Sequence, residues 1–170
     1  ADADVYRFLR YFTLLSVAEI DALEQADAER QGRPEAQGVL AREVTRLVHG
    51  DEGLKAAERI TAALFSGDLS DLSEQDYEQL GQDGLPSSEL DVASLADTPL
   101  TTLLSEAGVA TNGKQVKDAL QRGAVIVNGA ACGVEDNMKA AEIFDSANAV
   151  FGRFFMVKLG KKKHHLFKLA

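Results

Sequence analysis

The sequence predicts an α+β fold with three parts: a helical bundle over residues 1–67, an acidic linker with a short helix over 68–98, and a small domain over 99–170. In the small domain, two helices are expected to pack on a short, mostly antiparallel sheet. Three observations support this prediction. In the N-terminal part of the chain, apolar residues recur at helical spacing. The chain then has no Lys or Arg between Arg59 and Lys114, while acidic residues accumulate. Beyond that stretch, alternating apolar residues flank two turn signals.

The N-terminal part should form consecutive helices. Asp4 can cap the first helix, whose apolar face carries Val5, Phe8, Leu9 and Phe12. Ser16 and Glu19 have the spacing of a capping box, which predicts a second helix extending to about Arg30. These signals indicate a compact helical bundle.

A third helix should follow the Arg33-Pro34 break. Its buried stripe is expected to comprise Leu40, Val44, Leu47 and Val48. Arg42 and Arg46 lie one turn apart and share another face. His49-Gly50 should end this helix, and a new one should run from about Asp51 to Phe65.

Residues 68–98 are strongly acidic and contain few large apolar side chains. A short helix is expected from about Ser73 to Leu80, followed by a turn-rich stretch. Such a segment would repel a polyanion, so it is interpreted as a spacer and not as a binding surface.

Residues 99–135 carry the most specific pattern. Leucines at helical spacing end at Gly108, and Asn112 is placed to cap a second, basic helix. The N-terminus of that helix is suited to a phosphate. Lys114 and Lys117 share one face, whereas Val116, Ala119 and Leu120 point into a core. Asn128-Gly129 then follows a short Val-rich strand, as in a hairpin.

The C-terminal end of the chain predicts a second hairpin with a cationic tip. Two apolar strands, starting near Val150 and His164, flank the sequence Gly160-Lys161-Lys162-Lys163. An exposed tip with three lysines is suited to contact phosphates. A lysine cluster that protects a sheet edge or improves solubility is the alternative.

Composition limits the function classes. Through Thr98 the chain has 21 acidic and 8 basic residues, net −13, whereas from Pro99 onward it has 6 acidic and 10 basic residues, net +4; together these give the overall charge of −9. The average therefore hides a cationic C-terminal part. Cys132 is the only cysteine, which excludes an intrachain disulfide and a thiolate metal cluster. No apolar run approaches the length of a membrane span, and a cytoplasmic location without membrane contact is expected.

The run PLTTLLSEAGVATNGKQVKDALQRGAVIVNGAACGVE resembles the small RNA-binding domain first described in ribosomal protein S-four. The resemblance lies in the order of the elements: the leucines, the stop at Gly108, the basic helix, the strand and the Asn-Gly turn. The chain departs from the family in having Asn112-Gly113 where Ser-Arg is common, and in having Asp118 on the basic helix.

The stretches DADVYRFLRYFTLLSVAEIDALE, AQGVLAREVTRLVHG and AAERITAALFSGDLSDLSE resemble the helical domain that follows the catalytic domain in bacterial tyrosyl-tRNA synthetases. In that family an anticodon-binding helical domain precedes an S-four-like domain, in the order seen here. The resemblance implies a C-terminal tRNA-binding region with tyrosine tRNA as its partner. It further implies association with the enzyme's own catalytic domain and a homodimer formed through that domain.

No HIGH-type or KMSKS-type signature occurs, so the chain should be inactive alone. ATP and tyrosine would bind the catalytic domain, and neither a cofactor nor a metal is expected for this chain. His164 and His165 would face opposite sides of a strand, which argues against a shared metal site. An S-four-like fragment of a ribosome-associated or RNA-modifying protein is the alternative function.

The residues expected to contact RNA are mostly basic. The resemblance implies that Asp2, just ahead of the first helix, reads the first anticodon base, because a carboxylate can accept two hydrogen bonds from guanine. Asp4 is the first alternative reader. The remaining candidates are Arg7, Arg10, Arg42, Arg46, Asn112, Lys114, Lys117, Arg122, Arg153, Lys161, Lys162 and Lys163.

Overall fold

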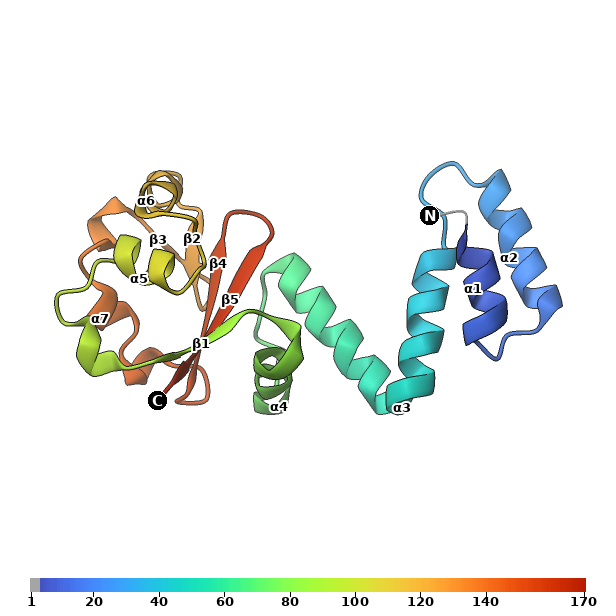
Figure 1. The fold of residues 1–170 in the computed structure, drawn as a ribbon, viewed down its shortest axis with the longest axis horizontal. Coiled ribbons are helices and arrows are strands. Elements are labelled where there is room, and N and C mark those ends of the chain that lie inside the picture. Colours follow the sequence, from blue (N-terminus) through green and yellow to red (C-terminus); the bar gives the residue numbers. More distant parts are fainter. Residues whose placement is uncertain (1–3) are drawn as a thin grey trace. The chain divides into compact units, whose positions relative to one another are not determined.

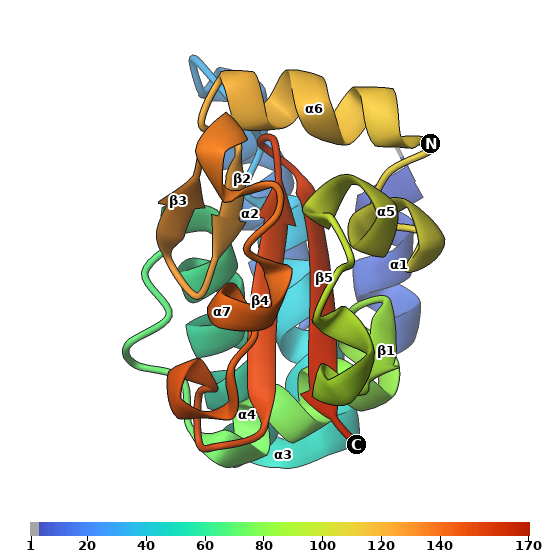
Figure 2. The same ribbon diagram turned by 90° about the vertical axis from the view of Figure 1, so that its left-hand side faces the viewer.

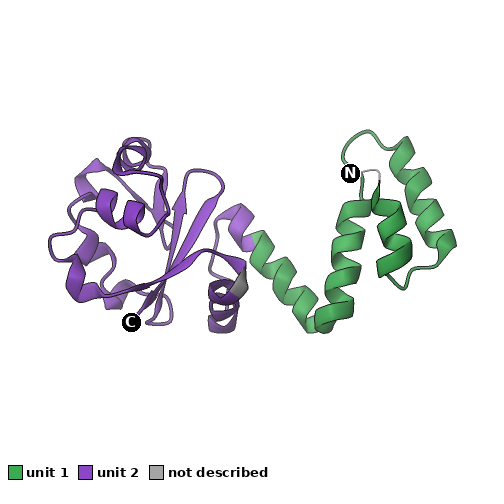
Figure 3. Ribbon diagram, in the orientation of Figure 1, with its two compact units in different colours: residues 1–62 green, residues 63–170 purple. Residues whose placement is uncertain are grey.

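The computed structural model describes residues 4–170, apart from the side chain of Asp83. The chain divides into two compact units, residues 1–62 and residues 63–170 (Figure 3). Asp2 lies outside the described residues. No helix among them is long and apolar enough to cross a membrane.

The first unit consists of helices. They are α1 (Val5–Phe12), α2 (Val17–Glu29) and most of α3 (Ala36–Ser66), whose last turn belongs to the second unit (Figure 1). Gly50 interrupts α3 with a φ of 73°, a left-handed conformation that glycine adopts at little cost. The helix break expected at His49-Gly50 is therefore confirmed. The core of this unit is small and contains Val5, Leu9, Ile20 and Ala36.

Side-chain caps fix two of these helices. The Ser16–Glu19 capping box is confirmed at the start of α2. Asp27 lies at the other end of α2 and accepts hydrogen bonds from the backbone N–H groups of Glu35 and Ala36, at 2.7 and 3.0 Å. These bonds hold the pKa of Asp27 below its usual range and tie the loop before α3 to α2. The prediction that Asp4 caps α1 is wrong. The Asp4 side chain makes no cap hydrogen bond and forms an ion pair with Arg7.

The stripe expected on the third helix is only partly buried. Leu40 and Val44 are half-buried, whereas Leu47 and Val48 are 58% and 66% exposed. Their predicted burial is wrong because α1 and α2 cover only the first part of α3. An apolar face therefore remains open on this unit.

The second unit is built on a five-stranded mixed sheet in the order β1-β5-β4-β2-β3 (Figures 1 and 2). Only the β1–β5 pair is parallel. The strands are β1 (Ser87–Leu90), β2 (Val125–Val127), β3 (Ala130–Cys132), β4 (Phe154–Leu159) and β5 (Lys163–Leu169). The mostly antiparallel sheet and both hairpins are thus confirmed.

Three helices lie over the core side of this sheet: α5 (Leu100–Glu106), α6 (Gly113–Gln121) and α7 (Ala140–Ile143). Their apolar residues pack on alternate side chains of the central strands, including Phe155, Val157 and Phe167. Phe144 follows α7, and its ring lies 5.0 Å from that of Phe155 in an edge-to-face arrangement. One-turn helices occupy Val92–Leu95, Val134–Asp136 and Ser146–Asn148.

The acidic segment does not behave as a spacer, because it is built into the second unit. It forms α4 (Glu74–Gln79), a π-helical turn (Leu80–Gly84) and the edge strand β1. Five of its large apolar residues are almost fully buried: Leu72, Tyr77, Leu80, Leu90 and Leu95. Leu69, Leu85 and Val92 are half-buried. The Asp76 side chain is buried and accepts hydrogen bonds from Ser73. The other described acidic side chains of this segment are exposed, which explains why the composition resembled that of a linker.

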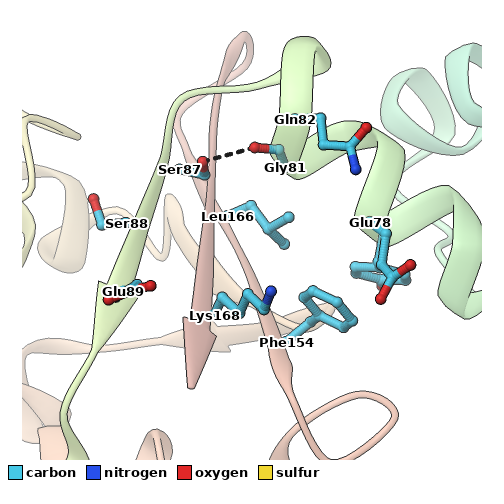
Figure 4. Close-up of a pocket in the computed structure, with 10 residues that line it drawn as sticks. Glu78, Gly81, Gln82, Ser87, Ser88, Glu89, Phe154, Leu166 and Lys168 are labelled. Atoms are coloured by element: carbon cyan, nitrogen blue, oxygen red, sulfur yellow. Dashed lines mark hydrogen bonds between the residues drawn. The ribbon is translucent and has the colours of Figure 1, made fainter. Parts of the chain in front are cut away.

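Figure 4 shows how this segment closes over the sheet. The Ser87 hydroxyl donates to the Gly81 carbonyl at 3.0 Å, above the apolar surface of Phe154 and Leu166. On β1, the Ser88 hydroxyl lies 3.0 Å from Nε2 of the buried His165. The first contact holds β1 to the π-helical turn, and the second fastens β1 to β5.

Candidate nucleic-acid interface

Helix α6 carries the first group of predicted RNA contacts. Asn112 caps it, as predicted: its side-chain oxygen accepts from the Gln115 N–H at 3.0 Å. Val116, Ala119 and Leu120 are buried, which confirms the predicted inner face. This packing leaves Lys114 and Lys117 exposed.

The β4–β5 turn carries the second group. Lys161, Lys162 and Lys163 are all exposed, and Gly160 begins the turn with a φ of 66°. The Gly160 N–H donates to the Ala124 carbonyl at 2.8 Å, which attaches the turn to the residues that follow α6. Figure 2 shows this turn lying close to α6.

A depression forms where α6 meets the turn. It is lined by Gln115, Ala119 and Arg122 from the helix and by residues 159–163 from the hairpin. Arg122 and the three lysines of the turn are here named the turn cluster. The fold therefore brings together cations that come from separate elements, far apart in the sequence.

Lys114 and Lys117 do not line this depression. Residues 115, 119 and 122 form the helix row that faces the turn, and at about 100° per residue the two lysines lie on another flank. We name Lys114 and Lys117 the helix flank. Asp118 lies between the two groups on the helix, so the predicted basic surface consists of two adjacent parts.

The turn cluster and the helix flank share an electrostatic property. Among the described residues, no acidic side chain forms an ion pair with any of these lysines or with Arg122. The Arg122 Nε–H instead donates to the backbone carbonyl of Asp118 at 3.0 Å. Their charges are available to an external anion.

Arg153 lies elsewhere. It precedes β4, whereas the turn cluster follows that strand, so the two are at opposite ends of it. Its Nη1 pairs with Glu74 at 3.0 Å and Glu78 at 2.9 Å, and its guanidinium lies over the Phe154 ring. Arg153 therefore fastens α4 to the sheet, and the structure does not bring it to the other cations.

The candidates of the first unit are mostly paired with carboxylates. Arg7 pairs with Asp4, Arg10 with Asp21 and Glu24, and Arg46 with Glu43 and Asp51. Arg42 is exposed on α3. Because ion-paired arginines offer less charge to a phosphate, these positions are weaker candidates than the lysines of the second unit.

The two histidines next to the turn add no positive charge at neutral pH. Burial lowers the pKa of His165 below its usual value, and burial together with the nearby Lys158 charge lowers that of His164. His165 is buried and His164 half-buried, on opposite sides of β5 as predicted. Burial raises the pKa of the Cys132 thiol, which stays protonated. The part of the chain that the structure describes holds no cluster of three metal-ligating side chains.

Sequence reasoning missed Gln115. Gln115 accepts a hydrogen bond from the Thr111 N–H and also lines the depression. The periodicity of α6 contained a usable signal, since Gln115, Ala119 and Arg122 recur at i, i+4 and i+7. Which row faces the hairpin depends on the tertiary packing of α6.

Comparisons with known proteins bear on both units. Residues 76–167 match a family model described as the tyrosine–tRNA ligase SYY-like C-terminal domain. Residues 1–66 match a model for class I tRNA synthetases of the W and Y type. The first match includes most of α4 and all of β1, in agreement with their place in the second unit.

Curated relatives cover nearly the whole chain. The tyrosine–tRNA ligases of Aliivibrio fischeri and Aliivibrio salmonicida are 49% and 50% identical over 167 residues, and that of Laribacter hongkongensis is 48% identical over 166 residues. Each alignment covers 98% of this chain and 37% of the ligase. A solution structure of a tyrosyl-tRNA synthetase C-terminal domain is 32% identical; it covers 64% of this chain and all of its own, with a TM-score of 0.35.

Proposed function

The chain belongs to the family of tyrosine–tRNA ligase C-terminal domains, and we propose that it binds tyrosine tRNA and positions it for aminoacylation by a ligase of which it is the C-terminal part. The observation that carries this proposal is the turn cluster beside the helix flank. These cations lack acidic partners among the described residues and occupy one end of the second unit.

The chemistry of the two groups suits an RNA backbone. Lysines act as point charges for phosphates, and such contacts fix the position of a nucleic acid without reading its sequence. Arg122 adds a planar donor beside the turn. We assign the backbone of the long variable arm to this surface and the anticodon stem-loop to the first unit.

A salt titration tests the assignment. Replacing Lys161, Lys162 and Lys163 with alanine should lower the affinity for any tRNA and reduce the slope of log K against log salt by about 0.7 to 0.9 per lost phosphate contact. Replacing Lys114 and Lys117 measures the helix flank separately. Lys55→Ala is the matched control, because Lys55 is exposed on α3 but is paired with Glu52. Equal slopes for the wild type and both lysine variants would leave these residues as solubilising charge.

Base recognition by Asp2 is a finer proposal, which rests on the sequence resemblance alone. If its carboxylate accepts two hydrogen bonds from a guanine at the first anticodon position, Asp2→Arg should cost about 1 to 3 kcal/mol for that base. The loss should be smaller for cytosine, whose pairing edge has acceptors. Aminoacylation by the full-length ligase of two tyrosine tRNAs that differ at this base measures the difference. Equal losses would assign the role to another residue, with Asp4, Arg7 and Arg10 next.

The catalytic step is expected to need the rest of the ligase. The relatives are much longer than this chain, and we propose that ATP and tyrosine bind their remaining part and that a homodimer forms through it. The alternative, an S-four-like fragment acting on ribosomal or other structured RNA, predicts no preference for tyrosine tRNA. A competition between tyrosine tRNA and a tRNA with a short variable arm separates the two.

A further inference from the structure

The sequence contains the dipeptide Asn-Gly twice, at Asn112-Gly113 and at Asn128-Gly129. An Asn side chain followed by Gly can deamidate spontaneously, because a residue without a Cβ leaves its backbone nitrogen open to the side-chain amide carbon. Asn112 caps α6, whereas Asn128 belongs to the turn between β2 and β3. The same dipeptide therefore lies in two different environments within one unit.

The Asn128 amide is held at both ends by distant parts of the second unit. Its Nδ2 donates to the Asn148 carbonyl at 3.0 Å, and its Oδ1 accepts from the Met156 N–H at 2.8 Å. The residue is half-buried, and its backbone is left-handed with a φ of 48°. Both hydrogen bonds must break before the amide can reach the Gly129 nitrogen. Reaction at Asn128 thus requires the turn to separate from β4 and from Asn148.

The Asn112 amide is held by one local contact. Asn112 is exposed, and its Oδ1 accepts from the Gln115 N–H at 3.0 Å. Among the described residues, neither its Nδ2 nor the Gly113 N–H makes a hydrogen bond. The Gly113 N–H is one of the donors that the first turn of a helix leaves free. Fraying of this single turn releases the Asn112 amide, and a helix end frays at little cost.

We propose that Asn112 is a site of spontaneous deamidation, and that the carboxylate formed there preserves the α6 cap but weakens RNA binding. The Gly113 nitrogen attacks Cγ of Asn112, so that a new C–N bond forms and the bond from Cγ to the amide nitrogen breaks. Ammonia leaves with the proton from the Gly113 nitrogen. Water then opens the cyclic imide at either carbonyl and gives aspartate or isoaspartate, with no change in oxidation state. The effect on RNA rests on the proposed function, whereas the chemical step does not.

The aspartate product affects stability and charge differently. Asp and Asn cap helices about equally well, and a negative charge at a helix N-terminus interacts favourably with the helix dipole. The new charge would lie at the exposed start of α6, two residues before Lys114 of the helix flank. There it repels a phosphate that approaches the helix flank, and salt screens this repulsion. Isoaspartate adds a methylene group to the main chain and so disrupts the cap as well.

Peptide mapping by mass spectrometry tests the assignment of the site. The chain is incubated at mildly alkaline pH without RNA, and the conversion of each Asn-Gly site to the acid is followed with time. Asn112 should convert at least about tenfold faster than Asn128 in the folded chain, because a helix end opens far more often than a packed turn. The two rates should converge in urea, where neither amide is held. A rate at Asn112 equal to or below that at Asn128 in the folded chain overturns the proposal.

Two variants at the same position test the consequence for RNA. Asn112→Asp should keep the wild-type melting temperature, since the cap is retained. Its affinity for tyrosine tRNA at low salt should be about two- to fivefold below that of Asn112→Ser, the range expected for a single exposed charge. Asn112→Ser keeps a capping oxygen and cannot deamidate, so its affinity should stay constant during incubation while that of the wild type declines.

The outcomes separate this proposal from the proposed function. Equal affinities of Asn112→Asp and Asn112→Ser for tyrosine tRNA would refute the effect of the new charge on RNA binding. A wild-type chain that binds no tRNA refutes the proposed function instead. The mapping experiment uses no RNA, so it decides in either case whether Asn112 deamidates.

Discussion

Tyr77 offers a direct test of how the acidic segment is integrated into the second unit. It lies on α4 and is 1% exposed. Its ring stacks on Phe154 with the centroids 5.5 Å apart and meets Phe151 edge to face at 5.9 Å. The hydroxyl is buried and has no hydrogen-bond partner among the described residues. The ring should therefore stabilise the unit while the hydroxyl destabilises it.

Two substitutions separate these contributions. Tyr77→Ala removes the buried ring and should lower the free energy of unfolding by about 3 to 5 kcal/mol, as for other buried aromatic residues. Tyr77→Phe keeps the ring and removes a polar group whose unsatisfied burial costs about 1 to 3 kcal/mol. We expect Tyr77→Phe to match or exceed the wild type by up to about 1 kcal/mol, because the surroundings can relax in part around the hydroxyl. Tyr77→Ala should thus lower the free energy of unfolding, whereas Tyr77→Phe should keep or raise it.

Urea denaturation of this chain, followed by far-UV circular dichroism, gives the two free energies. Proteolysis at intermediate urea, with the fragments identified by mass, shows which unit has opened. If the free energy of unfolding of Tyr77→Ala lies within about 0.5 kcal/mol of the wild-type value, α4 contributes nothing to stability and the segment is a spacer. If Tyr77→Phe is less stable than the wild type by more than about 1 kcal/mol, the Tyr77 hydroxyl makes a stabilising hydrogen bond.

Three further predictions concern the second unit and the first. Burial lowers the folded-state pKa of His165 below the unfolded value, so its contribution to stability is complete above the unfolded pKa and is lost as the pH falls. The melting temperature should drop between about pH 7 and pH 5, and His165→Gln should flatten this part of the profile. Gly108→Ala should destabilise by about 1 kcal/mol, because φ is +74° there and no atom crowds the new methyl group. Gly38→Ala, in the helical part of α3, should instead stabilise by about 0.5 to 1 kcal/mol; urea denaturation measures both.

Local signals in the sequence were sufficient for the α6 region. The Asn112 cap, the inner face of α6 and the Asn128-Gly129 turn each depend on residues within a few positions of one another, and all three are confirmed. The turn has positive φ at both residues, 48° and 85°, which is the conformation that this dipeptide favours in two-residue hairpins.

The acidic segment could not be predicted in the same way, because its partners are distant. Ser88 of β1 pairs with Phe167 of β5, near the other end of the unit's sequence, and so short a strand has too little pattern to show its register. The high acidic content concealed the few buried residues. Arg153 illustrates the same limit: a cation in a basic region was expected to face RNA, yet its acidic partners are Glu74 and Glu78 on α4.

The exposed half of α3 shows a different limit. The apolar periodicity of Leu40, Val44, Leu47 and Val48 correctly identifies an apolar stripe but does not say what covers it. Within the described residues, α1 and α2 cover only its first part. A stripe that is apolar in sequence and open in structure marks a surface available for contact.

The placement of the acidic residues also explains how a chain of net charge −9 can present a surface suited to RNA. Glu74 and Glu78 neutralise Arg153 at one end of β4, while the turn cluster lies beyond the other end without acidic partners among the described residues. Coulomb interactions between exposed charges are screened over about 8 Å at physiological ionic strength, so a phosphate bound at the turn responds mainly to the nearest cations. The salt dependence of binding should therefore follow the number of lysines at this end of the sheet and be insensitive to the net charge of the chain.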